Sequence, residues 1–211
     1  MWKRAIVIGA GAAAALAISA GCSGGGSGSE QSGQGASTSV TAESSTNEHN
    51  DADAMFVAHM IPHHEQAVGM SDVVLAKQGI DPRVTDLATD IKAAQGPEIK
   101  QMQDWLGQWG NPPMPPMATQ EGHGGHDMDG MSGDGMGMMS DEEMTALKNA
   151  NGVEAGRLFL TGMITHHEGA IAMAQNEIEG GKFAPAVELA RAIVKTQQQE
   201  IDTMKGILET M

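Results

Sequence analysis

The spacing of apolar residues along the chain predicts long α-helices. Apolar positions recur three and four residues apart, which places them on one face of a helix. Glycines and an Asp-Pro pair mark the ends, because Gly terminates helices and Asp followed by Pro begins them. The pattern predicts four long helices at about 53–78, 81–109, 153–179 and 185–211, and a short helix after the capping box Ser140-Asp-Glu-Glu143.

The helical pattern is duplicated. Met-Ile-x-His-His-Glu-x-Ala-x-x-Met occurs at 60–70 and 163–173, and Gln-x-x-Glu-Ile-x-x-Met occurs at 95–102 and 197–204. Each half therefore predicts a helical hairpin with His-His-Glu on its first helix. Two such hairpins bury each other's apolar faces in a four-helix bundle with approximate two-fold symmetry. We expect an all-α, ferritin-like bundle over 51–211, with hairpins at about 51–109 and 141–211.

The first fifty residues differ in composition from the rest of the chain. Residues 1–21 carry two basic residues before an apolar run, as a secretory signal does, and the only cysteine, Cys22, follows at once. The segment resembles a bacterial lipoprotein signal, which implies a lipidated Cys22 that anchors the chain at the outer face of the cytoplasmic membrane. An ordinary cleaved leader and an uncleaved N-terminal anchor are the alternatives. Residues 22–50 are rich in Gly and Ser and are expected to be a flexible tether.

Charge and cysteine content narrow the class of function. The chain has 12 basic and 27 acidic side chains, so that loss of the leader with its two basic residues leaves a net charge near −17. This charge argues against nucleic-acid binding and favours cationic partners, although it also serves solubility. With a single cysteine, the chain has neither an intrachain disulfide nor a thiolate-cluster metal site.

Helical phasing places polar candidates on the buried faces. His63 and His166 fall on the apolar stripes of the first and third long helices, and Glu98 and Glu200 fall on those of the second and fourth. Burial of an unpaired imidazolium or carboxylate is unfavourable, or shifts its pKa towards the neutral form. We expect the inward histidines to face these glutamates. Two explanations remain open: a metal site between the hairpins, or structural His–Glu hydrogen bonds across the core.

The other polar residues of the repeat lie further round the helices. We expect His64 and His167 at the edge of the stripe, either in a His/Met site nearer the surface or solvated. Glu65 and Glu168 are expected to point away from the site. His59 lies one turn before the first inward histidine, a spacing that lets two imidazoles share a metal, and a solvated position is again the alternative.

Methionine content favours copper over other metals. Thioether sulfur is soft and binds Cu(I) well, and imidazole accommodates Cu(II). Core methionines alone are weak evidence, since Met commonly fills gaps between helices. The candidate metal ligands in the helices are His59, His63, His64, His166, His167, Met60, Met102, Met163, Met204, Glu98 and Glu200.

The segment between the hairpins, 110–140, is low in complexity and has no apolar period. It contains four prolines, two histidines and seven methionines. We expect a mobile loop, in which methionines with no core to fill favour metal capture over a plain linker. The candidate capture residues are His123, His126, Met128, Met131, Met136, Met138 and Met139.

The two copies of the His-His-Glu segment, each followed by Gln-x-x-Glu-Ile-x-x-Met, resemble the bacterial family called domain of unknown function 305. The resemblance covers about 51–211. It implies a ferritin-like four-helix bundle, export or lipid anchoring and, as in some members, periplasmic copper binding linked to copper tolerance. It further implies that copper is bound by His63, His64, His166 and His167 and by the flanking Met60, Met70, Met163 and Met173.

The leading hypothesis is an exported, non-enzymatic protein that binds copper and sequesters it or passes it to a copper-handling partner by ligand exchange. One alternative is a structural or interaction lipoprotein with a buried His–Glu core. Another is a ferritin-like di-metal oxidase, which uses Glu-x-x-His motifs. That signature is absent, because the residues three positions after Glu65, Glu98, Glu168 and Glu200 are Val68, Gln101, Ile171 and Thr203.

Overall fold

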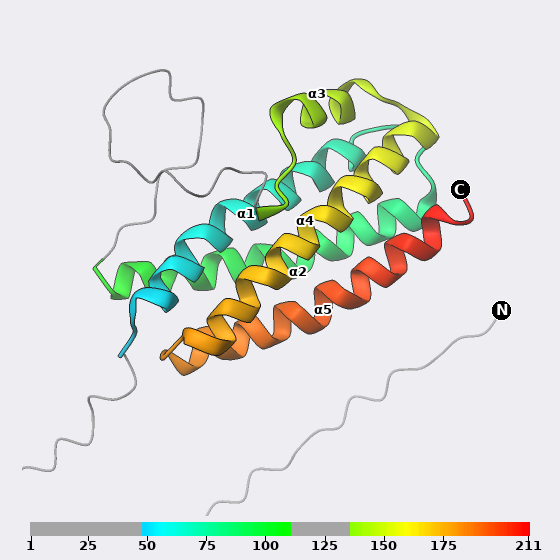
Figure 1. Cartoon of the computed structure of the whole chain (residues 1–211). Coiled ribbons are helices and arrows are strands. Elements are labelled where there is room, and N and C mark those ends of the chain that lie inside the picture. Colours follow the sequence, from blue (N-terminus) through cyan, green and yellow to red (C-terminus); the bar gives the residue numbers. More distant parts are fainter. Residues whose placement is uncertain (1–47, 111–135) are drawn as a thin grey trace, which may run out of the picture. The chain divides into compact units, whose positions relative to one another are not determined.

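The computed structural model describes residues 48–110 and 136–211. These residues form four long helices and one short one, and the described part contains no strand (Figure 1): α1 (Asp51–Leu75), α2 (Pro82–Gln108), α3 (Asp141–Asn149), α4 (Gly152–Gly180) and α5 (Ala184–Leu208). The predicted all-α fold is confirmed, including the short helix. The predicted signal peptide, Cys22, most of the tether and the loop residues His123, His126, Met128 and Met131 lie outside the described residues.

Local sequence explains where the helices begin. The Asn50 side chain accepts a hydrogen bond from the Asp53 N–H at 3.1 Å, and the Asp53 carboxylate accepts one from the Asn50 N–H at 2.6 Å. Ser140 and Glu143 form the predicted capping box at α3. Such caps satisfy N–H groups that have no partner inside the helix. The helices continue through Pro62 and Pro97.

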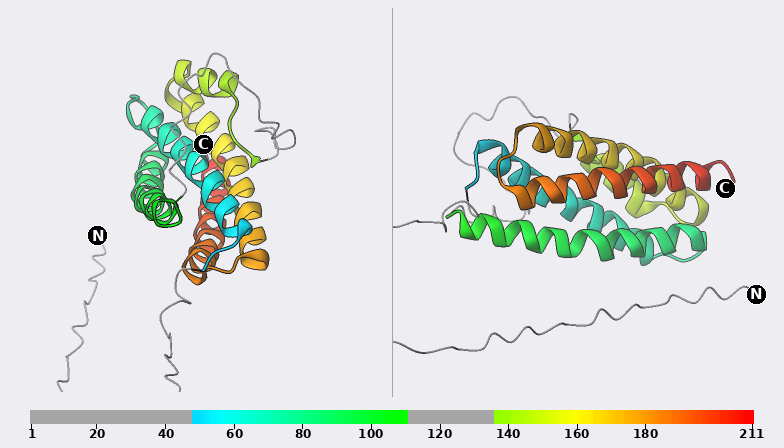
Figure 2. Two further views of the ribbon diagram at one scale, coloured as in Figure 1. Left: turned by 90° about the vertical axis from the view of Figure 1, so that its left-hand side faces the viewer. Right: turned by 90° about the horizontal axis from the view of Figure 1, so that it is seen from below.

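The helices pack as two antiparallel hairpins. α1 packs against α2 and α4 packs against α5, while α1 and α4 contact each other between the hairpins and run in opposite directions (Figures 1 and 2). The short helix α3 lies over α1 and α4. Each His-His-Glu helix therefore has two long neighbours, its hairpin partner and the other His-His-Glu helix.

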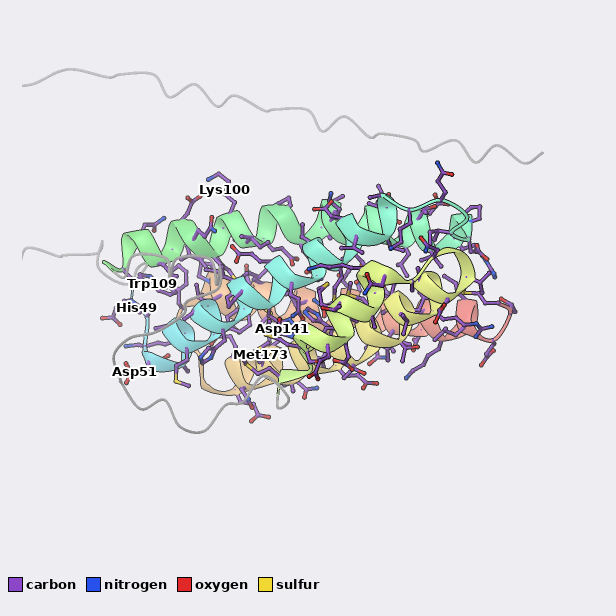
Figure 3. The ribbon with its side chains drawn as sticks, turned by 90° about the horizontal axis from the view of Figure 1, so that it is seen from above. His49, Asp51, Lys100, Trp109, Asp141 and Met173 are labelled. Carbon is purple, nitrogen blue, oxygen red and sulfur yellow. The ribbon has the colours of Figure 1, made fainter. Side chains whose placement is uncertain are left out.

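The predicted stripes form most of the core. The stripe of α1 is buried throughout, and the stripes of the other long helices are buried apart from Met173, Glu98 and Glu200, which are half-buried. At one end of the bundle, the ring of His49 stacks on Trp109 with centroids 4.2 Å apart (Figure 3). None of the helices in the described ranges is both long and apolar enough to cross a membrane.

Residues 136–139 form part of the packed structure. Met139 is only 9% exposed and packs in the core with residues of α1 and α4. The expectation that this segment has no core to fill is therefore wrong for its last residues. The physical reason lies in Gly162 on α4, because a β-carbon there would overlap the Met139 methyl group.

Two buried carboxyl groups join the start of α1 to the end of α4. Asp53 is buried and accepts hydrogen bonds from the N–H groups of Lys182 and Phe183 at 3.0 and 2.9 Å. Glu177 is 1% exposed. Burial first, and then the neighbouring Asp53 carboxyl, raises the pKa of Glu177 from 4.5 to about 8.

Glu177→Gln is expected to change how stability depends on pH. Because the pKa of Glu177 is about 8 in the fold against 4.5 ordinarily, the native state holds a proton that the unfolded chain releases between these values. The contribution of Glu177 to stability therefore falls as pH rises through this window. We expect the variant to gain stability relative to the wild type from pH 5 to pH 9, by a few kcal/mol at most, in urea unfolding at each pH. Parallel pH profiles of the two proteins would contradict this account.

Candidate metal centre

Two histidines meet where α1 contacts α4. The ring centroids of His63 and His166 are 3.7 Å apart with their planes inclined at 36°, and both side chains are fully buried. The contact joins equivalent positions of the two repeats, as the approximate two-fold symmetry requires. The prediction that both histidines face the core is confirmed.

His64 and His167 contact the two glutamates, a contact that was expected of His63 and His166. Nε2 of His64 lies 2.8 Å from Oε2 of Glu98, and Nε2 of His167 lies 2.7 Å from Oε2 of Glu200. Both imidazoles are fully buried, while the glutamates keep 23% and 14% of their side chains exposed. The expectation of an edge position for His64 and His167 was therefore wrong, as was the pairing of the inner histidines with glutamate.

The error has a geometric cause. Successive residues of a helix point about 100° apart, so a single apolar stripe buries only one of two adjacent histidines. However, α1 packs against both α2 and α4, and α4 packs against both α5 and α1. The buried face of each helix is therefore wide enough for both histidines. The first histidine of each pair points to the opposite hairpin. The second points to the partner helix of its own hairpin.

These side chains form a layer across the bundle. Glu98 and Glu200 line a cavity of about 10 Å³ between α2 and α5, together with the buried amides of Gln95 and Gln197. That volume is close to the minimum for one water molecule. The polar layer, as we call it, consists of His63, His64, Glu98, His166, His167 and Glu200.

A backbone carbonyl sets the proton position of His63. Nε2 of His63 lies 2.9 Å from the carbonyl oxygen of Met136. A carbonyl only accepts, so Nε2 carries the proton and donates it, and Nδ1 of the neutral ring keeps its lone pair. Nδ1 is buried and has no hydrogen-bond partner among the described residues.

The glutamates set the proton positions of the other pair in the same way. A carboxylate accepts from Nε2 of His64 and from Nε2 of His167, which leaves Nδ1 of each ring as the nitrogen that glutamate does not engage. Both Nδ1 atoms are buried without a partner, and His166 has no partner at either nitrogen within the described ranges. All four imidazoles therefore present a buried nitrogen with no hydrogen bond.

Burial keeps the inner histidines neutral. Desolvation lowers the pKa of His63 from 6.5 to about 3, aided by the nearby histidines and opposed by the Met136 carbonyl. Desolvation also lowers the pKa of His166 well below 6.5. A metal binds only the unprotonated nitrogen. Both rings therefore stay in the ligand form across the physiological pH range.

Thioether sulfurs are the other soft donors of this core. Met60 and Met163 are fully buried, three residues before His63 and His166 on their helices. The predicted ligands Met70, Met102 and Met204 are also fully buried, and packing alone explains them equally well. Within 48–110 and 136–211, no three His, Asp or Glu side chains converge as a metal site.

The remaining candidates lie outside the polar layer. His59 and Met173 are half-buried and line a surface pocket. Glu168 is exposed and lies 3.7 Å from the Lys205 ammonium, in agreement with the prediction that it points away. Glu65 is half-buried, and burial raises the pKa of its carboxyl.

Sequence reasoning missed the segment that covers His63. The Gln66 side chain accepts a hydrogen bond from the Met139 N–H and donates one to the Met139 carbonyl, both at 2.8 Å. On α4, Gly169 lets the Met136 carbonyl approach so closely that a β-carbon would overlap it. The repeat held a signal for this contact, because Gly162 and Gly169 stand where the first copy has larger residues.

Gly169→Ala is expected to displace residues 136–139 from the bundle. The added methyl group overlaps the Met136 carbonyl, so the hydrogen bonds of this segment to His63 and Gln66 weaken. We expect faster hydrogen exchange at the Met139 N–H and a stability loss of about 1–3 kcal/mol. Gly69→Ala is the matched control, since a β-carbon at this α1 position meets nothing within 4 Å. Equal effects of the two substitutions would contradict the proposed packing role of Gly169.

Comparison with known proteins gives a consistent family match. Residues 53–208 match the sequence profile of the family described as Domain of unknown function (DUF305). The structure is similar to that of a DUF305 fragment from Deinococcus radiodurans, with a TM-score of 0.65 and 34% identity over 77% of this chain and 98% of that chain. A DUF305 protein from Streptomyces coelicolor matches with a TM-score of 0.63 and 34% identity over 75% of this chain and 91% of its own.

A further similar structure contains copper. The Cu(I)-bound form of CopM matches with a TM-score of 0.58 and 28% identity over 75% of this chain and 96% of that chain. The Cu(II)-bound form of the same protein matches with the same TM-score and 31% identity. Comparison with curated proteins gave no match.

Proposed function

Because the chain belongs to the DUF305 family, we propose that it binds copper outside the cytoplasm and either sequesters the ion or passes it on. The single observation that carries this proposal is the polar layer, in which four buried imidazoles each have a nitrogen without a hydrogen bond. The Cu(I), Cu(II) and silver forms of the similar protein CopM support it.

The energetics of the polar layer favour a ligand over a purely structural role. A buried polar atom without a partner costs about 1–3 kcal/mol. Five imidazole nitrogens of the layer have no partner among the described residues. The combined cost is comparable with the whole stability of a typical domain, about 5–15 kcal/mol. Coordination of a metal satisfies an unprotonated nitrogen directly, and only the single N–H of the neutral His166 ring would remain without a partner.

The inner pair supplies the centre of the proposed site. His63 and His166 come from different hairpins, and Met60 and Met163 add thioethers one turn away. Imidazole with thioether is a donor set that suits Cu(I). The rings touch in the structure, so they must turn to direct their lone pairs at one ion. The ion is cargo in this proposal, and its transfer proceeds by ligand exchange without catalysis.

Glu98 and Glu200 take a supporting role in this proposal. A carboxylate that accepts from one imidazole nitrogen orients the ring and raises the basicity of the other nitrogen. The hydrogen bonds to His64 and His167 have this arrangement. We therefore propose that the two glutamates orient these histidines and do not bind the metal directly.

Two parts of the proposal include residues outside the described ranges. We propose that the Met and His residues of 111–135 collect copper, together with Met136 and Met138, and that a lipidated Cys22 anchors the chain to the membrane. The thioether and imidazole donors of 111–135 support the first assignment. The signal-like sequence before Cys22 supports the second. The Streptomyces coelicolor relative, described as secreted, supports export.

A structural or interaction lipoprotein is the second candidate function. The two His–Glu hydrogen bonds favour it, because they satisfy one nitrogen of His64 and of His167 without a metal. It leaves the lone pairs of His63 and His166 unexplained. A di-metal oxidase receives no such support, since the Glu-x-x-His signature is missing from the sequence.

Replacing His63 and His166 together with Ala is expected to remove at least one tight copper site. The substitution takes away the two nitrogens that meet between the hairpins. The measurement is the copper(I) and copper(II) stoichiometry of the full chain in titration, with helicity followed by circular dichroism. His49→Ala is the control, because His49 stacks on Trp109 away from the polar layer. An unchanged stoichiometry in the double variant would overturn the assignment.

Replacing Glu98 and Glu200 together with Gln is expected to weaken copper binding without loss of a site. Removal of a carboxylate that orients a ligating histidine typically lowers metal affinity about 10–100-fold. Competition with a chromophoric copper chelator measures this change. Loss of a whole equivalent would instead make the glutamates direct ligands, and an unchanged affinity would make the His–Glu pairs purely structural.

A further inference from the structure

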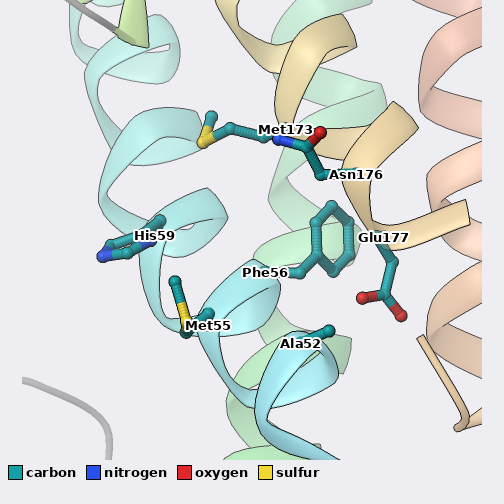
Figure 4. Close-up of a pocket in the computed structure, with 7 residues that line it drawn as sticks. All are labelled: Ala52, Met55, Phe56, His59, Met173, Asn176 and Glu177. Atoms are coloured by element: carbon teal, nitrogen blue, oxygen red, sulfur yellow. The ribbon is translucent and has the colours of Figure 1, made fainter. Parts of the chain in front are cut away.

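The groove between α1 and α4 is covered at one end and open at the other. Residues 136–139 and α3 pack over the end that contains Met70 and Gly162. At the opposite end lies a pocket of about 160 Å³ between the start of α1 and the end of α4, which the described residues leave open (Figure 4). The internal repeat relates the two ends, so the pocket is the open counterpart of the covered end.

The residues of the two ends differ in chemistry. At the covered end, Gly162 has no side chain and Met139 fills the space beside it. At the open end, the equivalent positions carry donors for soft metals and one acid. In pairs related by the repeat offset of 103 residues, Met55 replaces Leu158, His59 replaces Gly162, Met173 corresponds to Met70, and Glu177 replaces Val74.

Three of these donors surround one opening. Met55 and His59 lie one turn apart on α1, and Met173 reaches towards them from α4 (Figure 4). Met55 is 52% exposed, although an apolar side chain of this size is normally buried. His59 and Met173 are half-buried. Their sulfur and nitrogen atoms are thus near solvent, unlike those of the polar layer.

The pocket also contains a buried acid. Glu177 is 1% exposed, and neither of its carboxyl oxygens has a hydrogen-bond partner among the described residues. Its carboxyl group lies beside Ala52 and Phe56 in the same pocket (Figure 4). Burial and the neighbouring Asp53 carboxyl raise the pKa of Glu177 to about 8, so this acid stays protonated at neutral pH and adds a polar group without charge to the pocket.

We propose that Met55, His59 and Met173 form a second, solvent-open site for a soft monovalent cation, Cu(I) or Ag(I). The proposal rests on the proposed copper-binding function and adds a site to it. Two thioethers and one imidazole form a soft donor set that favours Cu(I) over zinc, calcium or magnesium. The site lies on the same two helices as His63 and His166 but at the surface.

The test compares the full chain with the triple variant Met55→Leu, His59→Gln, Met173→Leu in Ag(I) and Cu(I) titrations. These substitutions nearly conserve side-chain volume and lie at exposed or half-buried positions, so the fold is expected to persist. We expect the variant to lose one equivalent of Ag(I) and of Cu(I). Met144→Leu on α3 is the matched control, because Met144 packs against the core away from this pocket, and it is expected to lose none.

A second measurement needs no substitution at the pocket. In the wild type labelled with ¹³C at the methionine methyl groups, Ag(I) is expected to shift the signals of Met55 and Met173. The same shifts are expected in the variant with His63→Ala and His166→Ala, because the open site does not use these residues. Unshifted methyl signals, or an unchanged stoichiometry in the triple variant, would overturn the open site while copper binding at the polar layer stands. A wild type that binds no copper would overturn both proposals.

Discussion

The contact between α1 and α4 is the constraint on which the rest of the structure depends. Each of these helices packs against its hairpin partner and against the other, so its buried face spans more than one stripe. Two adjacent histidines fit on such a face, one directed across the bundle and one directed along the hairpin. His63 and His166 meet at the first interface, and His64 and His167 reach glutamates at the second.

The bundle combines a symmetric centre with asymmetric ends. At the centre, both repeats contribute the same residues, and each His–Glu pair has its counterpart within 0.1 Å in length. At the ends, Gly162 makes room for Met139, whereas His59 stands at an open pocket. The asymmetry lets a segment from between the hairpins reach the central histidines, because the Met136 carbonyl accepts from His63. The proposed open site and the covered groove are thus two outcomes of one duplicated arrangement.

The sequence was sufficient for the fold but only partly for the candidate site. Helical spacing, glycine and proline positions and one capping box predicted the helices to within a few residues, and the repeat predicted that His63 and His166 face inward. The burial of His64 and His167 depends on the fact that each of their helices packs against two others. A single apolar stripe predicts contact with only one neighbouring helix. The contact of Met136 with His63 is made by a backbone carbonyl, and such a contact leaves no signal in residue type. The glycines opposite this segment were a signal only by comparison of the two repeats.

Nuclear magnetic resonance of the imidazole nitrogens during Cu(I) titration tests the central claim most directly. Cu(I) is diamagnetic, so long-range ¹H–¹⁵N correlations report each Nδ1 and Nε2 separately in the full chain. We expect Nδ1 of His63 and one of the two ring nitrogens of His166 to shift on addition of Cu(I), while Nε2 of His64 and of His167 keeps the proton that it donates to glutamate. If all four imidazoles retain their metal-free nitrogen shifts at saturating Cu(I), the polar layer is not the copper site.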